Sequence, residues 1–264
     1  MKDYILANKR AWEDAYEHSK DSFKDIVRPL RKSPSHFIPL LLQENLDIKD
    51  IKNKSIAQLA CNNGREILSL GMTFNAKQIT GFDLAENMII AARKSAKELD
   101  VKASFYAGNV LDIDASLDAS FDTIFVLIGV LFWFESMPDF FATIHRLLKP
   151  GGRLYLLEGH PITNMFAFEG EPEYDAIRPF SPAHSYFKAT PFIDTDGMTY
   201  MSDEAYESPA FVSHVHTLES IIQSLLNQGF SLNMFKEDNT NYLNTFPELD
   251  GGNVPLVFLL KATR

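Results

Sequence analysis

The sequence predicts a single α/β domain built on a mostly parallel sheet of seven strands. Three observations support this fold class. Short apolar runs alternate with amphipathic helical segments up to residue 160, the last two apolar runs are joined by a loop, and residues 161–213 interrupt the alternation. Apolar strands that alternate with helices are typical of a parallel sheet covered on both faces. We therefore expect helices on both faces, one antiparallel strand near the edge, and an inserted cap over the carboxyl ends of the strands.

The elements are expected in the following order. Residues 1–50 form an N-terminal helical segment in which Ile5, Trp12 and Tyr16 can share one face. Residues 51–160 form a core of alternating strands and helices. Its predicted strands are 55–60, 78–82, 102–108, 121–127 and 152–159. Its predicted helices are 65–70, 85–99 and 139–148, the last stopped by the Pro-Gly pair that follows.

Two further segments complete the domain. Residues 161–213 are rich in Pro, Phe, Tyr and acidic residues, and they can form strands around an Asp196-Gly197 turn. Residues 214–264 begin with a helix that Thr217 can cap and Gly229 can end. Two strands follow, 230–235 and 254–262. Because a loop without a helix joins them, they are predicted to run antiparallel.

Composition narrows the class of function. The chain has 264 residues, of which 45% are apolar, and a net charge of -10. An acidic surface repels phosphate backbones, so a small molecule is a better partner than nucleic acid. The single cysteine, Cys61, allows no intrachain disulfide and no multi-cysteine zinc site, and we expect no metal. The sequence shows neither a signal peptide nor a membrane span, so we expect a cytoplasmic monomer or homodimer without a membrane partner.

Polar residues follow the predicted strands at their carboxyl ends, where open parallel sheets bind ligands. Asp83 ends the second strand, nineteen positions after Gly64, and is placed to accept hydrogen bonds from two ribose hydroxyls. Asn109 offers an amide to an adenine edge, and Val110 offers an apolar face to the ring. The helix that opens at Gly64-Arg65 presents free N–H groups to an anion. Together these residues suit a nucleoside that carries a carboxylate or phosphate.

Simpler interpretations of the same residues stay open. Asp83 can be a helix cap, Cys61 a small buried filler, and Asn62-Asn63 an ordinary turn, because Asn tolerates left-handed geometry. The dinucleotide pattern GxGxxG is absent. A pyrophosphate needs close backbone approach along that turn, so NAD and FAD are disfavoured.

Four longer motifs follow one another in the core. They are "IAQLACNNGREILSL", "TGFDLAENMIIAARKSA", "FYAGNVLDI" and "FDTIFVLIGVLFWF" with the later "LLKPGGRLYLLEGHP". These motifs resemble those of class I S-adenosylmethionine-dependent methyltransferases, strongly over residues 50–160 and weakly beyond. The general pattern has acidic residues where Gln58 and Asn109 stand, and glycines where Ala60 and Asn62 stand. However, "ACNNGRE" and "EGHP" are similar to a branch with a Gln-Cys-Asn-x-Gly turn and a Glu-x-His-Pro after strand five.

The resemblance implies a Rossmann-like class I fold with S-adenosyl-L-methionine as cofactor. It implies that the turn after strand one lines the methionine end, that Asp83 holds the ribose, and that the residues after strand three hold the adenine. Carried over by position, the cofactor-binding residues are Ala60, Cys61, Asn62, Gly64, Asp83, Leu84, Met88, Gly108, Asn109, Val110, Leu127 and Val130. Related enzymes fold an N-terminal helix over the cofactor, which makes Trp12 and Tyr16 candidates. A plain packing helix is the alternative for these two residues.

The function that the resemblance implies is methyl transfer to a small, apolar or aromatic acceptor by in-line displacement. Residues 161–213 are expected to form the acceptor pocket, because they are rich in aromatic side chains. An aromatic surface that forms a dimer is the alternative. His160 and His216 are candidate general bases, although each can be a structural histidine. Glu158 can orient a group or take a proton.

Two other functions stay open. One is a non-catalytic protein that binds S-adenosylmethionine or S-adenosylhomocysteine, which the departures at Gln58 and Asn109 motivate. The other is an NAD-dependent oxidoreductase. The sequence names neither the acceptor nor the atom that accepts the methyl group.

Overall fold

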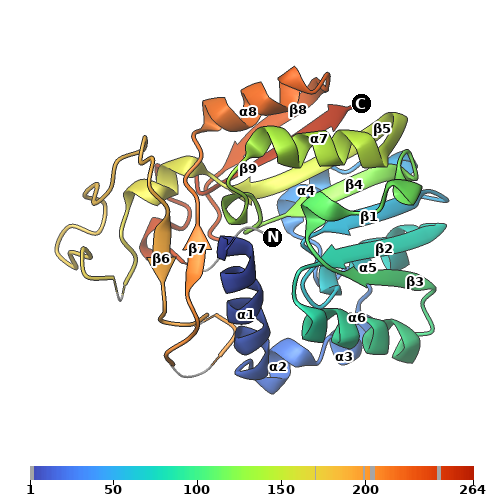
Figure 1. Cartoon of the computed structure of the whole chain (residues 1–264), viewed down its shortest axis with the longest axis horizontal. Coiled ribbons are helices and arrows are strands. Elements are labelled where there is room, and N and C mark those ends of the chain that lie inside the picture. The colour runs from blue at the N-terminus through green and yellow to red at the C-terminus, as the bar shows by residue number, and fades with distance from the viewer. Residues whose placement is uncertain (1–2, 170, 199, 203–205, 243–244) are drawn as a thin grey trace.

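The structure is a computed structural model that describes residues 3–169, 171–198, 200–202, 206–242 and 245–264 (Figure 1). Its centre is a seven-stranded sheet with the order β3-β2-β1-β4-β5-β9-β8. The strands are β1 (Ser55–Leu59), β2 (Gln78–Asp83), β3 (Ala103–Ala107), β4 (Phe121–Leu127), β5 (Leu148–Gly159), β8 (Ser231–Asp238) and β9 (Val257–Thr263). The helices that flank it are α5 (Arg65–Phe74), α6 (Glu86–Glu98), α7 (Met137–Leu147) and α8 (Leu218–Asn227). The predicted α/β class is confirmed.

The direction of the strands also agrees with the prediction. β1 to β5 pair in parallel, whereas β9 runs antiparallel to both β5 and β8. The reversed strand β9 therefore lies one position in from the edge strand β8. The connection explains the reversal, because the described residues between β8 and β9 hold only a loop with a short 3-10 turn, Pro247–Leu249. Several boundaries differ by a few residues; for example, β5 begins at Leu148, directly after α7, rather than at 152.

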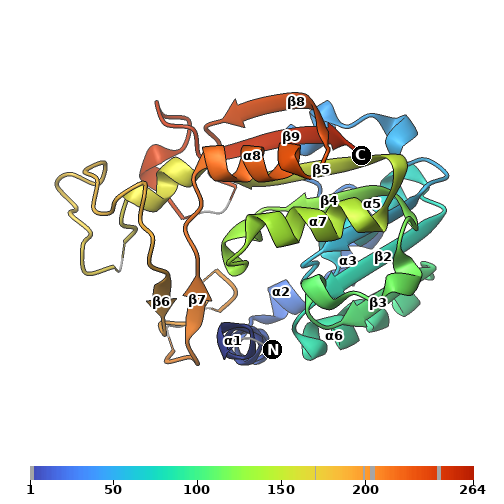
Figure 2. The same cartoon turned by 45° about the horizontal axis from the view of Figure 1, so that its top comes forward.

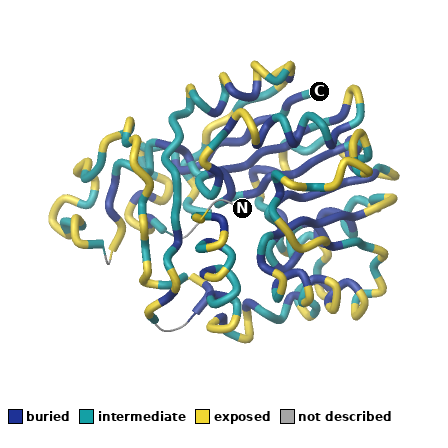
Figure 3. Tube along the Cα trace, in the orientation of Figure 1, coloured by how far each residue is buried: buried dark blue, intermediate teal, exposed yellow. Residues whose placement is uncertain are grey.

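Two apolar cores lie on opposite faces of the sheet. One core packs α7 and α8 against the sheet, with Phe141 and Leu225 among its buried residues. The other core packs α5 and α6 against the opposite face, with Leu68 and Ile89 among its residues. Figure 3 shows that the central strands are buried along most of their length. Burial on both faces explains why these strands are continuous apolar runs in the sequence.

The N-terminal segment is helical and crosses the carboxyl ends of the strands. Its helices are α1 (Asp3–Glu17), α2 (Asp21–Lys24), α3 (Val27–Lys32) and α4 (Leu40–Asn45). In Figures 1 and 2, α1 lies beside β7 (Phe211–Ser213) of the insertion. The Asn8 side chain joins them: its Nδ2 donates to the Val212 carbonyl at 2.9 Å, and its Oδ1 accepts from the Val212 N–H at 2.7 Å. The helix and the insertion are thus fixed to each other by a two-point amide contact.

The insertion differs from its prediction in how its strands pair. β6 (Phe192–Asp194) precedes the Asp196-Gly197 turn, but it pairs with β7 instead of a strand directly after that turn. Residues 199 and 203 of the predicted hairpin lie outside the described residues. Little of the described insertion is buried, so its apolar residues have no strict period that could fix the pairing. Across the described residues, no helix is long and apolar enough to cross a membrane.

Candidate functional site

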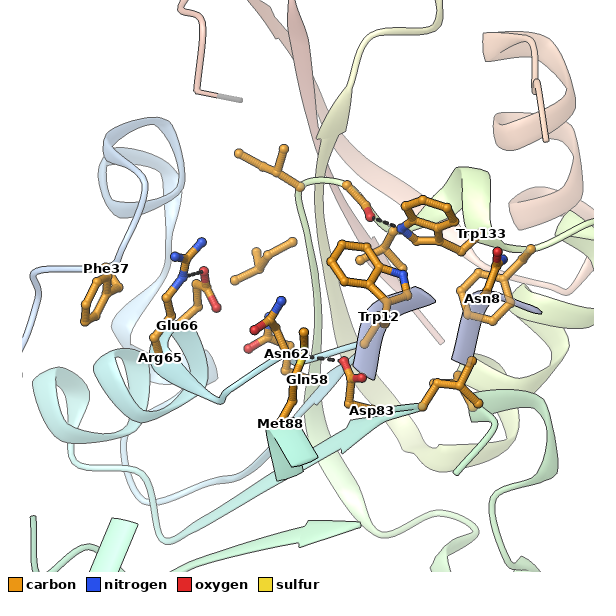
Figure 4. Close-up of a pocket in the computed structure, with 18 of the residues that line it drawn as sticks. Asn8, Trp12, Phe37, Gln58, Asn62, Arg65, Glu66, Asp83, Met88 and Trp133 are labelled. Atoms are coloured by element: carbon orange, nitrogen blue, oxygen red, sulfur yellow. Dashed lines mark hydrogen bonds and ion pairs between the residues drawn. The ribbon is translucent and has the colours of Figure 1, made fainter. Parts of the chain in front are cut away.

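A cavity of about 450 Å³ opens at the carboxyl ends of the parallel strands, beneath α1 (Figure 4). This is where open parallel sheets bind ligands, and the volume is that of a small-molecule site. The strand ends contribute Gln58, Ala60 and Asn62 at the end of β1, Asp83 and Leu84 at the end of β2, Asn109 and Val110 after β3, and Leu127 to Val130 at the end of β4. Helix α1 contributes Tyr4, Ile5, Asn8 and Trp12, and the loops contribute residues 36–39 and Tyr242.

The turn after β1 keeps a glycine-type backbone at positions that are not glycine. The φ angle is 52° at both Ala60 and Asn62, and 79° at Gly64. Left-handed backbone costs about 1–2 kcal/mol for a residue with a Cβ atom, and Asn reduces this cost by bonding locally. Asn62 does so, because its Oδ1 accepts from the Asn63 N–H at 2.7 Å. The turn therefore has the torsions of a glycine-rich loop, and Ala60 carries the strain.

Asp83 is tied to this turn by hydrogen bonds. Its Oδ2 accepts from the Asn62 N–H at 2.7 Å, and its Oδ1 accepts from the Ala85 N–H at 2.9 Å. The side chain lines the cavity although the residue is only 9% exposed. Burial raises the pKa of Asp83 to about 6, and the backbone hydrogen bonds oppose this rise. Asp83 is therefore a carboxylate at neutral pH and becomes protonated in mild acid.

One end of the cavity is polar and contains an ion pair. Arg65 and Glu66, from the first turn of α5, pair through Arg65 Nε and Glu66 Oε1 at 2.5 Å. The guanidinium lies over the rings of Phe23 and Phe37, at 5.1 and 5.8 Å from their centroids. Gln58 is 2% exposed, and its Oε1 has no hydrogen-bond partner among the described residues. A buried acceptor without a partner is costly, so this atom is suited to a donor on a ligand.

The other end of the cavity is aromatic. Trp12 of α1 packs edge-to-face on Trp133, with ring centroids 5.3 Å apart. Both rings also contact Phe211 of β7, at 5.4 and 5.8 Å. The apolar side chains of Met88 and Val110 also line the cavity. Figure 4 shows Trp12 above Asp83, and Trp133 farther from Arg65 and Glu66 than Asp83 is, so the two ends of the cavity differ in chemistry.

The cavity wall contains most of the predicted cofactor-binding residues. They are Trp12, Ala60, Asn62, Asp83, Leu84, Met88, Asn109, Val110, Leu127 and Val130. The side chain of Asn109 is partly engaged, because its Oδ1 accepts from the Leu111 N–H at 3.2 Å and its Nδ2 donates to Asp112 at 2.9 Å. An adenine edge would meet only the second N–H of that amide.

The structure places four other predicted residues away from the wall. Tyr16 packs half-buried in the cluster under α1, and Gly108 is exposed beyond β3. Cys61 is fully buried in the core beside α5, and burial raises the pKa of its thiol. Gly64 is packed so closely that a Cβ there would lie 2.8 Å from the Phe105 ring. None of these four residues is part of the described cavity wall.

The two histidines predicted as general bases also lie outside the described cavity wall. His160 Nδ1 accepts from the Ile162 N–H at 3.2 Å, and its Nε2 is 3.1 Å from Glu237 Oε1. His216 Nε2 lies 2.8 Å from the Phe134 carbonyl oxygen. Burial lowers the pKa of both imidazoles. Each ring makes a contact within the described structure, and a general base at His160 or His216 stays a prediction.

Several residues of the cavity wall were not predicted. Examples are Glu66 and the loop residues 36–39. Gln58 and Arg65 also line the cavity, although the sequence does not predict that their side chains contact a ligand. A signal existed for Arg65 and Glu66, since they open the helix directly after the turn. None existed for the loop, which comes close only through tertiary packing. Of the described residues in the aromatic insertion, Tyr200 alone lines the cavity.

The chain is similar in sequence to known methyltransferases over its core. Residues 56–152 match a family described as a methyltransferase domain. A ubiquinone biosynthesis O-methyltransferase of Xanthomonas oryzae pv. oryzae is 32% identical over 110 residues, which are 40% of this chain and 44% of the relative. A demethylmenaquinone methyltransferase of Lactococcus lactis subsp. lactis is 28% identical over 137 residues, which are 50% of this chain and 52% of the relative. The chain thus spans about half the length of the curated relatives it matches.

Solved structures extend the likeness of fold to the whole chain. An S-adenosylmethionine dependent methyltransferase from Mesorhizobium loti aligns with a TM-score of 0.63 and 24% identity, over 85% of this chain and 96% of that one. A geranyl diphosphate C-methyltransferase from Streptomyces coelicolor A3(2), solved with Mg²⁺, geranyl diphosphate and S-adenosyl-L-homocysteine, aligns with a TM-score of 0.61 and 13% identity, over 100% and 98%. Residues 56–152 therefore resemble a methyltransferase domain, and the chain has the Rossmann-like fold of the solved S-adenosylmethionine-dependent methyltransferases.

Proposed function

We propose that this chain is an S-adenosyl-L-methionine-dependent methyltransferase that acts on a small acceptor. The order of chemistry along one cavity supports the proposal best. Arg65 and Glu66 lie at one end, Asp83 lies between with Trp12 above it, and Trp133 lies toward the other end (Figure 4). The cofactor has the same order, from a charged amino-acid end through a ribose to an adenine. The domain match over residues 56–152 agrees with this cofactor.

The residues present fit the cofactor. Asp83 would accept from the ribose hydroxyls, as a buried carboxylate that faces the cavity. Arg65 would pair with the amino-acid carboxylate, and Glu66 together with the partnerless Oε1 of Gln58 would accept from the ammonium. Val110 would pack against the adenine ring. Each of the assigned residues lines the cavity.

The chain's own contribution to the reaction is to position the reactants and to exclude water. The cofactor, when bound, supplies a methyl group activated on a sulfonium. Helix α1 covers the cavity and is fixed to β7 through Asn8, which shields the reacting centre from solvent. Because His160 and His216 lie outside the wall, proton removal from an acceptor would fall to another group. The titratable side chains of the described wall are Tyr4, His36, Arg65, Glu66, Asp83, Tyr200 and Tyr242.

The acceptor is proposed to be small and apolar or aromatic. The support comes from the wall, where Tyr4, Phe37 and Phe134 line the cavity beyond the residues assigned to the cofactor. The relatives' names point the same way, since they refer to ubiquinone, demethylmenaquinone and geranyl diphosphate. Helix α1 and the loop 36–39, more than the insertion, are the proposed acceptor-facing elements.

Calorimetric titration with three ligands in parallel tests the function. The ligands are S-adenosylmethionine, S-adenosylhomocysteine and NAD, each added to the full chain. We expect micromolar binding of the two sulfur nucleotides and none of NAD. Binding of NAD alone would support the oxidoreductase instead. If both sulfur nucleotides bind but no small quinol, phenol or prenyl acceptor in a panel becomes methylated, a non-catalytic cofactor-binding protein is favoured.

A further inference from the structure

A buried carboxylate lies directly behind the cavity wall. Glu158, near the end of β5, is 2% exposed and is not part of that wall. Its Oε1 accepts from the backbone N–H groups of Gly129 at 2.5 Å and Gly159 at 2.7 Å. Its Oε2 accepts from those of Val130 at 2.7 Å and Leu131 at 2.8 Å. One side chain therefore holds three successive N–H groups of the loop after β4.

This loop forms part of the cavity and has a constrained shape. Leu127, Ile128, Gly129 and Val130 all line the wall. The φ angle of Gly129 is 91°, a left-handed value that glycine adopts without strain. Val130 and Leu131 are buried, so without Glu158 their N–H groups would be buried donors that lack this acceptor. The position of the loop thus depends on the carboxylate.

The same loop supports the helix that covers the cavity. The Trp133 indole N–H donates to the Gly129 carbonyl oxygen at 2.7 Å. The Trp133 ring in turn contacts the Trp12 ring of α1, with centroids 5.3 Å apart. An unbroken series of contacts therefore leads from Glu158 through Gly129 and Trp133 to the cover over the site.

We infer that Glu158 is a positioning residue, which sets the loop 128–133 and through it seats α1 over the cofactor cavity. The inference rests on the proposed function, because it assigns Glu158 an effect on cofactor binding. A carboxylate is suited to this task, since it is an acceptor at both oxygens and can meet four donors. Burial raises the pKa of Glu158 above its usual value, and the four backbone hydrogen bonds limit this rise because they stabilise the carboxylate.

Glu158→Gln tests the inference because it keeps size and shape but replaces one acceptor oxygen by an N–H₂ group. The two tryptophans of the chain are Trp12 and Trp133, so tryptophan spectroscopy reports on this contact series alone. In the full chain, we expect unchanged far-ultraviolet circular dichroism, a changed near-ultraviolet tryptophan signal, and easier quenching of tryptophan fluorescence by acrylamide. The dissociation constant of S-adenosylhomocysteine should rise by about tenfold or more.

Asp122→Asn is the matched control. Asp122 also accepts from a backbone N–H, that of Ser55 at 2.9 Å, but it lies at the opposite end of β4 and also pairs with Lys149. Because this carboxylate has only a structural role, its replacement should change thermal stability and leave tryptophan quenching and ligand affinity unchanged. If Glu158→Gln behaves like this control, the inference is wrong.

A second variant decides the question if Glu158→Gln does not fold. Trp133→Phe keeps an aromatic ring but removes the hydrogen bond to Gly129, and Trp12 remains as the single reporter. We expect stronger quenching of Trp12 and weaker binding of S-adenosylhomocysteine, and no change in either would overturn the inference. If the unmodified chain binds no S-adenosylhomocysteine, the proposed function fails, whereas the quenching comparison still tests the link from Glu158 to α1.

Discussion

The carboxylate of Asp83 accepts a hydrogen bond from the backbone N–H of Asn62 at 2.7 Å, although the two residues are on different strand ends. This bond fixes the turn after β1 to the turn after β2. It also fixes the direction in which the remaining acceptor capacity of Asp83 faces the cavity. The ribose assignment and the shape of the turn therefore depend on one side chain.

Removal of this carboxylate should weaken cofactor binding. We expect Asp83→Ala to weaken the binding of S-adenosylhomocysteine by about 1–3 kcal/mol, the range for hydrogen-bonding groups left without a partner. Calorimetry gives the dissociation constant. Asp114→Ala is the control, because Asp114 only caps an exposed 3-10 turn. Equal dissociation constants for the unmodified chain and Asp83→Ala would remove the ribose assignment.

Cofactor affinity should depend on pH through the same group. The pKa of Asp83 is about 6 in the folded chain, raised mainly by burial. The charged form accepts from the ribose, so affinity is complete above this pKa and falls as the pH decreases through it, by at most about tenfold per pH unit. Titrations between mildly alkaline and mildly acidic pH measure the effect. The dependence should vanish in Asp83→Ala, and its persistence there would assign it to another group.

The strained backbone at Ala60 should make glycine stabilising at that position. A φ angle of 52° destabilises the folded chain by about 1–2 kcal/mol when the residue is alanine. Glycine avoids this strain, but it destabilises the fold by up to about 1 kcal/mol because it increases the conformational entropy of the unfolded chain. We therefore expect Ala60→Gly to raise the free energy of unfolding by up to about 1 kcal/mol in chemical denaturation. Ala57→Gly, in the buried middle of β1, should lower it. A loss of stability in both variants would contradict the strain at Ala60.

The charged end of the cavity should discriminate between two ligands that share an adenosine and a sulfur. 5′-Methylthioadenosine lacks the amino-acid end of S-adenosylhomocysteine. Arg65→Gln should therefore weaken the binding of S-adenosylhomocysteine by about tenfold or more and leave the binding of 5′-methylthioadenosine nearly unchanged. Arg28→Gln is the control, since its side chain is 83% exposed and pairs only with Asp25 among the described residues. Equal losses for both ligands would mean that Arg65 supports the fold of the site rather than the amino-acid end.

The sequence predicted the sheet well because its central strands are buried on both faces. Ser55–Leu59 and Phe121–Leu127 are continuous apolar runs for this reason, and the helix-free connection before Val257–Thr263 indicated the reversed strand. The same logic placed Asp83 and Val110 at the cavity, since strand ends of a parallel sheet meet at one edge.

The rest of the site depends on contacts between distant segments, which local patterns do not report. The two-point contact of Asn8 with Val212 joins residues 204 positions apart. The bonds from Gly129 and Val130 to Glu158 are of the same kind. His160 illustrates the limit most directly, because its position after β5 is correct while its ring is held by Ile162 and Glu237.

The backbone of Ala60 and Asn62 has a consequence for how such chains are found. A glycine fingerprint is shorthand for a set of torsion angles, and this turn reaches those angles with a methyl group and an amide in place of hydrogens. A sequence search that requires glycine at these positions would miss this chain, and it would miss any other chain that adopts the same backbone with different residues. A search that demands a loop of three left-handed residues spaced by two, fastened to an acidic strand end, would retrieve it.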